Sequence, residues 1–185
     1  PSTMSTQSGS KTLNNGQIRE LPVAPGHIGH ILGSKPFLLL HYIKLEDGIP
    51  VDIAMVTVPP AEQFTKQSLI FSTYQSTGAP QVSNYISIMA PCQHFEQILL
   101  VPIQSSDSAL KYEEHSANMD NGDYCGLIRS LDSGVYKIGP NPDFPDAVYS
   151  AILYGSTDQG VFAYILASEL DQVTCSVDDS QEAVS

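Results

Sequence analysis

Charged residues are scarce in this sequence, and basic residues are the scarcest of them. Only 15% of the 185 residues are charged, with 8 Lys and Arg against 20 Asp and Glu, and the formal net charge is −12. A soluble domain usually has about 25% charged residues. Proteins that bind the phosphate backbone use basic side chains, which displace its counterions. The charge balance therefore argues against a protein that binds nucleic acid on its own.

The sequence also has few cysteines and no long apolar run. Cys92, Cys125 and Cys175 are odd in number and widely spaced, without a CxxC motif, so they predict no disulfide framework. The chain has no acceptor for N-glycosylation, which also favours a cytosolic protein. No apolar stretch approaches the ~18 residues of a membrane span, and the opening PSTMSTQSGSK lacks the layout of a signal peptide. We expect a soluble chain that forms one domain.

β-branched and aromatic residues are abundant, in short runs that turn residues separate. This pattern is typical of an all-β domain. The expected strands lie at 37–45, 49–58, 68–74, 82–89, 94–103, 124–131, 135–138, 147–154, 161–170 and 172–177. Hairpins are predicted at Asp47-Gly48, at 132–134 and at 156–160, where turn residues stand between two apolar runs.

Helix signals are weak. One short turn is expected after Pro59 and Pro60, over AEQFTKQ, and another within SDSALKYEEH. The number of strands and the long loops between them fit a two-sheet sandwich, either a jelly roll or an immunoglobulin-like fold. Because the strands have so few charges, we favour an all-β, eight-stranded jelly-roll β-sandwich with an extended N-terminal arm.

The expected domain organisation has three parts. Residues 1–34 form an extended polar N-terminal arm, residues 35–177 form the β-sandwich, and residues 178–185 form a flexible acidic tail. The arm has no sustained period, and its composition buries too little apolar area to offset the entropy of ordering. We therefore expect it to become ordered only on neighbouring subunits, anchored by the apolar residues between Leu21 and Leu32.

The segment NGDYCG around Cys125 resembles the nucleophile region of chymotrypsin-like viral cysteine proteases. Such a thiolate needs a histidine base and an acid to orient it, which would be His41 with Glu62 or Asp52. The sequence departs from that family, because Gly-Leu follows the cysteine, His41 lies in an apolar run, and no Gly-x-His follows. Cys125 is predicted to be a structural residue that packs as a small hydrophobe.

Other polar groups give only weak signals for a ligand. A histidine pair with HxxH spacing and three oxygen-bearing residues of an incomplete calcium loop could bind metals, and eight tyrosines could line a sugar-binding face. These metal candidates are His27, His30, Asp120, Asn121 and Asp123. His94 and His115 are isolated and are expected to be structural. We predict no catalytic residue, no metal site and no cofactor.

The polar arm, the β-rich body and the short tail together resemble the layout of a coat-protein subunit of a picorna-like virus. Size and arm are most similar to the small coat proteins of plant secoviruses such as cheraviruses. The resemblance covers the whole chain and includes no diagnostic motif. The start at Pro1 rather than Met fits release from a polyprotein.

This resemblance implies a jelly-roll capsid protein that packs with sister coat proteins into an icosahedral virion around RNA. It implies a location in the virion and, during assembly, in the host cytoplasm, with no enzymatic site and no membrane. Because the arm is not rich in Arg, contact with the encapsidated RNA is expected to be weak or indirect, with sister subunits or small cations neutralising the genome. Two alternatives stay open, namely the cysteine protease and a stand-alone β-sandwich that binds a receptor or a glycan.

Overall fold

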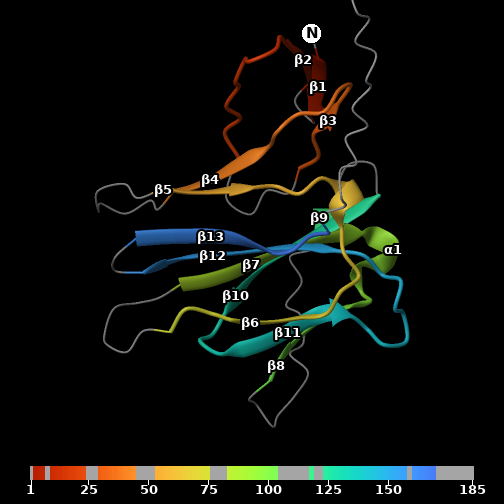
Figure 1. Cartoon of the computed structure of the whole chain (residues 1–185), viewed down its shortest axis with the longest axis vertical. Helices are drawn as coiled ribbons and strands as arrows, with labels where there is room; N and C mark the ends of the chain where they lie inside the picture. Colours follow the sequence, from red (N-terminus) through yellow and green to blue (C-terminus); the bar gives the residue numbers. More distant parts are fainter. Residues whose placement is uncertain are drawn as a thin grey trace, which may run out of the picture.

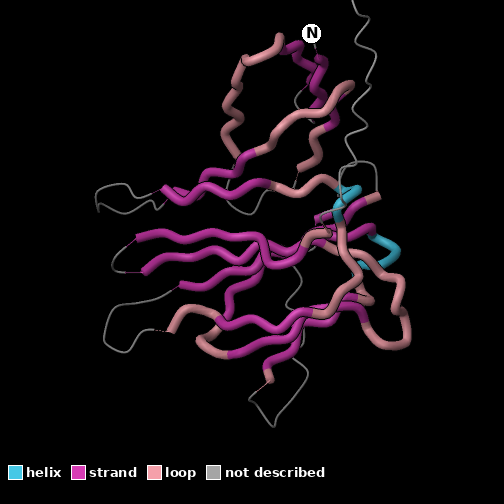
Figure 2. The backbone as a smooth tube through the Cα atoms, in the orientation of Figure 1, coloured by secondary structure: helices cyan, strands magenta, loops and turns pink. Residues whose placement is uncertain are grey.

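Strands that pair antiparallel make up nearly all the regular structure of this chain (Figures 1 and 2). The computed structural model describes residues 2–6, 9–23, 29–44, 53–75, 83–103, 117–118, 123–157 and 160–169. In these residues the helical elements are one 3-10 turn and one single-turn α-helix. The prediction of an all-β fold is confirmed.

Two sheets form the body of the molecule. The larger has the order β13 (Gly160–Ala167), β12 (Ser150–Thr157), β7 (Ser83–Pro91), β10 (Tyr124–Leu131), β9 (Ala117–Asn118). The smaller has the order β6 (Leu69–Ser72), β11 (Val135–Pro140), β8 (Ile98–Pro102). The chain passes from one sheet to the other at β6 to β7, β7 to β8, β8 to β9, β10 to β11 and β11 to β12.

The core lies between these two sheets. Side chains of β7 alternate along the strand, so that Ile86, Ile88 and Ala90 are buried while their neighbours are half-buried. They belong to one apolar cluster with Tyr136 and Ile138 of β11, across the sandwich. Alternation of this kind is typical of a strand with one face on a core. Full burial of a side chain of this size contributes about 1.5 to 3 kcal/mol.

The predicted hairpin at 132–134 is wrong. β10 pairs with β7 and β9, whereas β11 pairs with β6 and β8, so the chain changes sheets at this turn. Buried Thr73 holds the turn: its Oγ1 donates to the carbonyl of Asp132 at 3.0 Å and accepts from the amide of Gly134 at 2.7 Å. A corner between sheets and a hairpin both need turn residues between two apolar runs, so the local pattern did not distinguish them.

Two other predicted hairpin pairings are present. β12 and β13 pair antiparallel from Thr157↔Gly160 onward, and Gly160 has φ of 154°, which favours glycine. β4 (Leu40–Lys44) and β5 (Ile53–Thr57) pair in the register Tyr42↔Met55 and form a two-stranded ribbon. The predicted turn at Asp47-Gly48 lies outside the described residues.

The N-terminal arm contains strands that the sequence pattern did not predict. β1 (Ser2–Thr6) pairs with β2 (Gly9–Leu13) and with β3 (Leu32–Gly33) in a three-stranded sheet. Backbone groups make these ladders whatever the side chains are, so a polar stretch without periodicity can still pair. In Figure 1 this sheet lies on the far side of the β4–β5 ribbon from β13.

The short helical elements agree with the sequence in part. The turn expected after Pro60 is the 3-10 helix η1 (Ala61–Gln63). The expected strand 94–103 is shorter than predicted, because the α-helix α1 (Cys92–Phe95) precedes β8. Pro91 ends β7 and stands at the N-cap of α1, where its missing N–H costs nothing. The second expected turn, within 106–115, and the strand at 172–177 lie outside the described residues.

Candidate functional site

The sulfur of Cys125 is bonded to that of Cys92, so the expectation of reduced cysteines without a disulfide is wrong for this pair. Their Cα atoms are 4.8 Å apart, and the bond joins positions 33 residues apart in sequence. Strand register brings them together: Ala90↔Cys125 and Pro91↔Tyr124 pair between β7 and β10, and Cys92 comes next. Cys125 is structural, as predicted, but as half of a disulfide rather than as a free hydrophobe.

The residues of the suggested protease site are not assembled. His41 lies on β4 of the ribbon, whereas Cys125 lies on β10 of the larger sheet and has no free thiol. More than a third of the surface of His41 is exposed, yet partial burial of its imidazole lowers its pKa from 6.5. Glu62 is exposed on η1, and Asp52 lies outside the described residues. This geometry does not support a thiolate and imidazole pair.

Of the suggested metal ligands, only His30 and Asp123 lie in the part of the chain that the structure describes. His27, Asp120 and Asn121 lie outside the described residues, and so does His115. His30 is half-buried with its ring 6.0 Å from that of Tyr124, and Asp123 is exposed just before β10. In the described part of the chain, no three His, Cys, Asp or Glu residues lie close enough to hold a metal ion.

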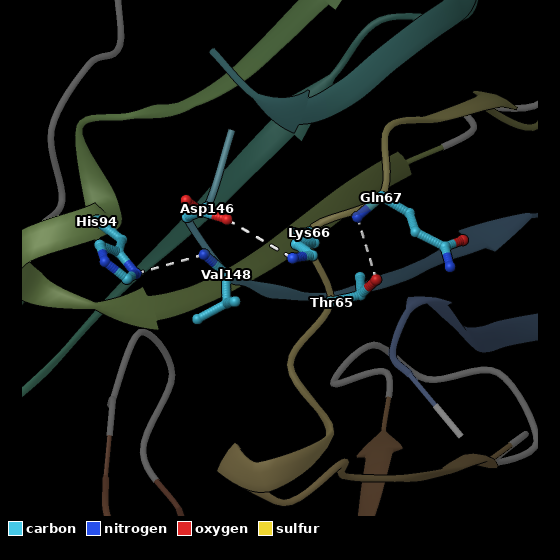
Figure 3. Close-up of polar contacts among 6 residues, drawn as sticks. All are labelled: Thr65, Lys66, Gln67, His94, Asp146 and Val148. Atoms are coloured by element: carbon cyan, nitrogen blue, oxygen red, sulfur yellow. Dashed lines mark hydrogen bonds and ion pairs between the residues drawn. The ribbon is translucent and has the colours of Figure 1, made fainter. Parts of the chain in front are cut away.

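His94 has a structural contact at the end of the sandwich (Figure 3). Its Nδ1 accepts a hydrogen bond from the backbone N–H of Val148 at 3.3 Å, which connects α1 to the segment before β12. In the same view, the Lys66 ammonium lies 3.6 Å from the Asp146 carboxylate. Both of these side chains are mostly exposed, so their ion pair contributes little to stability.

A group of hydrogen bonds around buried Thr65 and Tyr149 lies beside that ion pair. The backbones of Thr65 and Tyr149 exchange two hydrogen bonds of 2.8 and 2.9 Å. Thr65 Oγ1 also accepts a hydrogen bond from the amide of Gln67 at 3.1 Å (Figure 3). The hydroxyl of Tyr149 donates to the carbonyl of Gln67 at 2.9 Å, and burial raises the pKa of this phenol. These groups have partners within the chain, so they form a structural network rather than a site that awaits a ligand.

Aromatic rings line one edge of the larger sheet. Phe162 stacks on Tyr74 at 6.2 Å and on Tyr164 at 6.1 Å between ring centroids, and both tyrosines are partly exposed. On the other face of this sheet, Tyr85 of β7 stacks on its cross-strand partner Tyr154 at 5.5 Å. Each ring contacts a neighbour, as expected for pairs that stabilise a sheet.

The most conspicuous surface is one face of the β4–β5 ribbon. Successive side chains of a strand point to opposite faces, so the register places Tyr42, Ile53 and Met55 on one face. Their exposed fractions are 57%, 56% and 54%, whereas Ala54 and Val56 on the opposite face are buried. Leu38, just before β4, is 71% exposed. We call Leu38, Tyr42, Ile53 and Met55 the ribbon face.

The ribbon face could not be recognised from the sequence. All residues from Ile53 to Val56 are apolar, so periodicity did not show which side of the strand is buried. A sheet face with this many exposed apolar side chains is typical of a surface that another molecule covers. The described surface therefore fits an interaction with another chain better than binding of a small ligand.

Comparison of the chain with protein-family models, with curated proteins and with solved structures finds no significant match. Among the described residues, no helix is both long and apolar enough to span a membrane. What the structure defines is the class of the fold, an all-β protein whose main body is a sandwich of two antiparallel sheets.

Proposed function

We propose that this protein is a structural subunit of an icosahedral virus capsid that packs with sister coat proteins around an RNA genome. The body is proposed to be a jelly roll. The single observation that carries the proposal is the path of the chain, which changes between the two sheets of the body at five of its strand connections.

The strand order supports a jelly roll over a simpler sandwich. A double-sheet jelly roll consists of two Greek keys, so its chain returns repeatedly from one sheet to the other. Here β12, β7 and β10 are neighbours in one sheet, and β6, β11 and β8 are neighbours in the other, so strands far apart in sequence lie side by side. An up-and-down arrangement would instead pair each strand with the next along the chain.

The surface supports assembly with other subunits. Charged residues make up 15% of the chain, and apolar side chains are exposed on both sheets, such as Ile70 of β6 at 69% and Ile165 of β13 at 37%. The cores of protein interfaces are depleted in charges because desolvating a charge is costly. A surface of this composition can be buried between subunits with few unpaired charges.

The charge and the disulfide constrain how such a subunit would act. With a net charge of −12 it would contact RNA weakly or indirectly, and sister subunits or small cations would neutralise the phosphates. The proposed location is the virion, with the host cytoplasm as the place of assembly. A Cys92–Cys125 disulfide suits the virion stage, because disulfides persist on virion surfaces while the cytosol keeps thiols reduced.

The N-terminal arm is proposed to contact neighbouring subunits. Three of its apolar side chains, Ile18, Val23 and Leu32, are 93%, 58% and 56% exposed. A neighbour that covers them would stabilise the assembly by removing apolar surface from water. Limited proteolysis should therefore cleave the arm more slowly in particles than in free subunits, and equal rates would contradict this role.

The test of the proposed function is the mass of the native particle. The protein is purified from the tissue in which it is made and is analysed by sedimentation velocity and electron microscopy across pH and salt. We expect a shell of several megadaltons that contains RNA and this chain. A monodisperse monomer under all of these conditions would contradict the proposal.

A second candidate is a stand-alone module that binds a glycan, and the aromatic row Tyr74, Phe162 and Tyr164 favours it. The chain has no Trp, so its intrinsic fluorescence comes from tyrosine. A stable monomer whose tyrosine fluorescence changes saturably with an oligosaccharide would support the module. If Tyr74→Ala and Tyr164→Ala leave that change intact, the site lies elsewhere.

A further inference from the structure

We infer that the ribbon face is a contact between two copies of this chain, in which two β4–β5 ribbons stack face to face. This contact deepens the proposed function and rests on it in one respect, because a capsid would bring many copies of the chain together. One face of the ribbon is buried, and the other face is apolar and exposed.

The ribbon needs support beyond its own hydrogen bonds. A two-stranded sheet is marginally stable alone in water, and a third layer or strand usually stabilises it. β5 lies alongside β13 without joining its sheet, and Ala54 and Val56 are buried (Figure 1). On the side away from β13, the four side chains of the ribbon face remain more than half exposed.

The area of the ribbon face suits a weak dimer. Four large apolar side chains that are each more than half exposed present about 400 Å² in total. Two such faces, together with the rim residues Phe37, Leu40 and Thr57, would bury about 1,000 Å², which is near the lower limit for a specific interface. The contact is therefore expected to be weak in solution and to matter where many copies meet.

The chemistry of the face favours a second copy over a charged partner. Along this face the register includes one basic residue, Lys44 opposite Ile53 at the end of β4, and no acidic residue, so most of the face offers a charged partner no ion pair. Two flat antiparallel ribbons can stack at the ~10 Å spacing of packed sheets. A two-fold axis then brings the same residues together from both copies.

The net charge of the chain makes the affinity of this contact depend on salt concentration. Two copies that each carry −12 repel one another, and salt screens that repulsion. An apolar contact between them should tighten as ionic strength rises. A contact built on ion pairs would weaken instead.

The experiment measures self-association of the full chain by sedimentation equilibrium at 50 and 500 mM NaCl. Met55→Glu is the test variant, and Phe144→Glu is its matched control, because it also replaces a half-exposed apolar side chain by a carboxylate, in the loop between β11 and β12. Circular dichroism and thermal unfolding establish that both variants fold; Tyr42→Glu replaces Met55→Glu if that variant does not. We expect a salt-strengthened dimer that Met55→Glu weakens at least tenfold and Phe144→Glu leaves unchanged.

The outcomes separate this inference from the proposed function. A wild-type chain that stays monomeric at millimolar concentration, or equal weakening by both variants, would overturn the ribbon contact. A shell that forms normally with Met55→Glu would also overturn it and would leave the capsid proposal intact. Dimers that depend on Met55, without any shell in native material, would support the contact and contradict the capsid.

Discussion

Loss of the Cys92–Cys125 disulfide should lower the free energy of unfolding by about 3 to 4 kcal/mol. The bond joins residues 33 apart, and closing a loop of that length removes about 12.5 cal/mol/K of entropy from the unfolded chain in the loop-closure treatment. At 25 °C this corresponds to about 3.7 kcal/mol. The bond also holds α1 to β10, so its loss should loosen this end of the larger sheet.

The assay is urea unfolding followed by circular dichroism in a Cys175→Ala background, which prevents exchange with the third thiol. The variants are Cys92→Ala, Cys125→Ala and the double variant. Because either substitution removes the same bond, the double variant should lose about as much as each single one. A reducing agent should destabilise the parent and leave all three variants unchanged. Single variants as stable as the parent, or losses that simply add, would refute the reasoning.

Three further perturbations test the packing. Gly155→Ala should destabilise the protein by about 1 to 3 kcal/mol in urea unfolding, because a Cβ there would collide with the carbonyl oxygen of Ser83 on the neighbouring strand; an unchanged midpoint would contradict that close approach. Asn84→Ala should cost about 1 to 3 kcal/mol in thermal unfolding, because its buried amide accepts from the Tyr74 N–H at 3.0 Å and donates to the Tyr74 carbonyl at 3.1 Å. The variant leaves that N–H unpaired, whereas the carbonyl keeps the Ser133 hydroxyl as a donor at 3.2 Å. A smaller loss than for Gln97→Ala, whose amide is only partly buried, would argue against this role. Because the pKa of His41 is lower in the folded protein, the unfolded chain binds the proton more readily, and protonation of His41 lowers the free energy of unfolding as pH falls below 6.5. His41→Gln should therefore reduce the fall in melting temperature between pH 7 and pH 5. An identical pH profile for the variant and the parent would contradict the burial of this ring.

The sequence alone located most of the strands of the body. Tyr124–Leu131 was predicted with the bounds that β10 has, and the pairing of β12 with β13 was predicted from the turn residues between them. The turn after Pro60 was also expected where η1 lies. These features depend on residues close together in the chain, such as β-branched runs, prolines and turn dipeptides, so the sequence carries them directly.

The partners of the strands were decided by the tertiary structure. A strand can form a ladder with any other strand, and the choice depends on which apolar faces meet in the core. For this reason β10 and β11 separate into two sheets at the turn that Thr73 holds, and the polar β1 and β2 pair in the arm.

The same dependence on distant pairing explains why the two most informative surface and site features were missed. Cys92 and Cys125 meet only because β7 and β10 align Ala90 with Cys125, a register that the spacing of cysteines does not contain. The alternation of Ala54 and Val56 with Ile53 and Met55 is invisible in a run that is apolar throughout. Composition determined that the surface has few charges, but only the folded chain decided which apolar side chains stay exposed, because burial depends on what each face packs against.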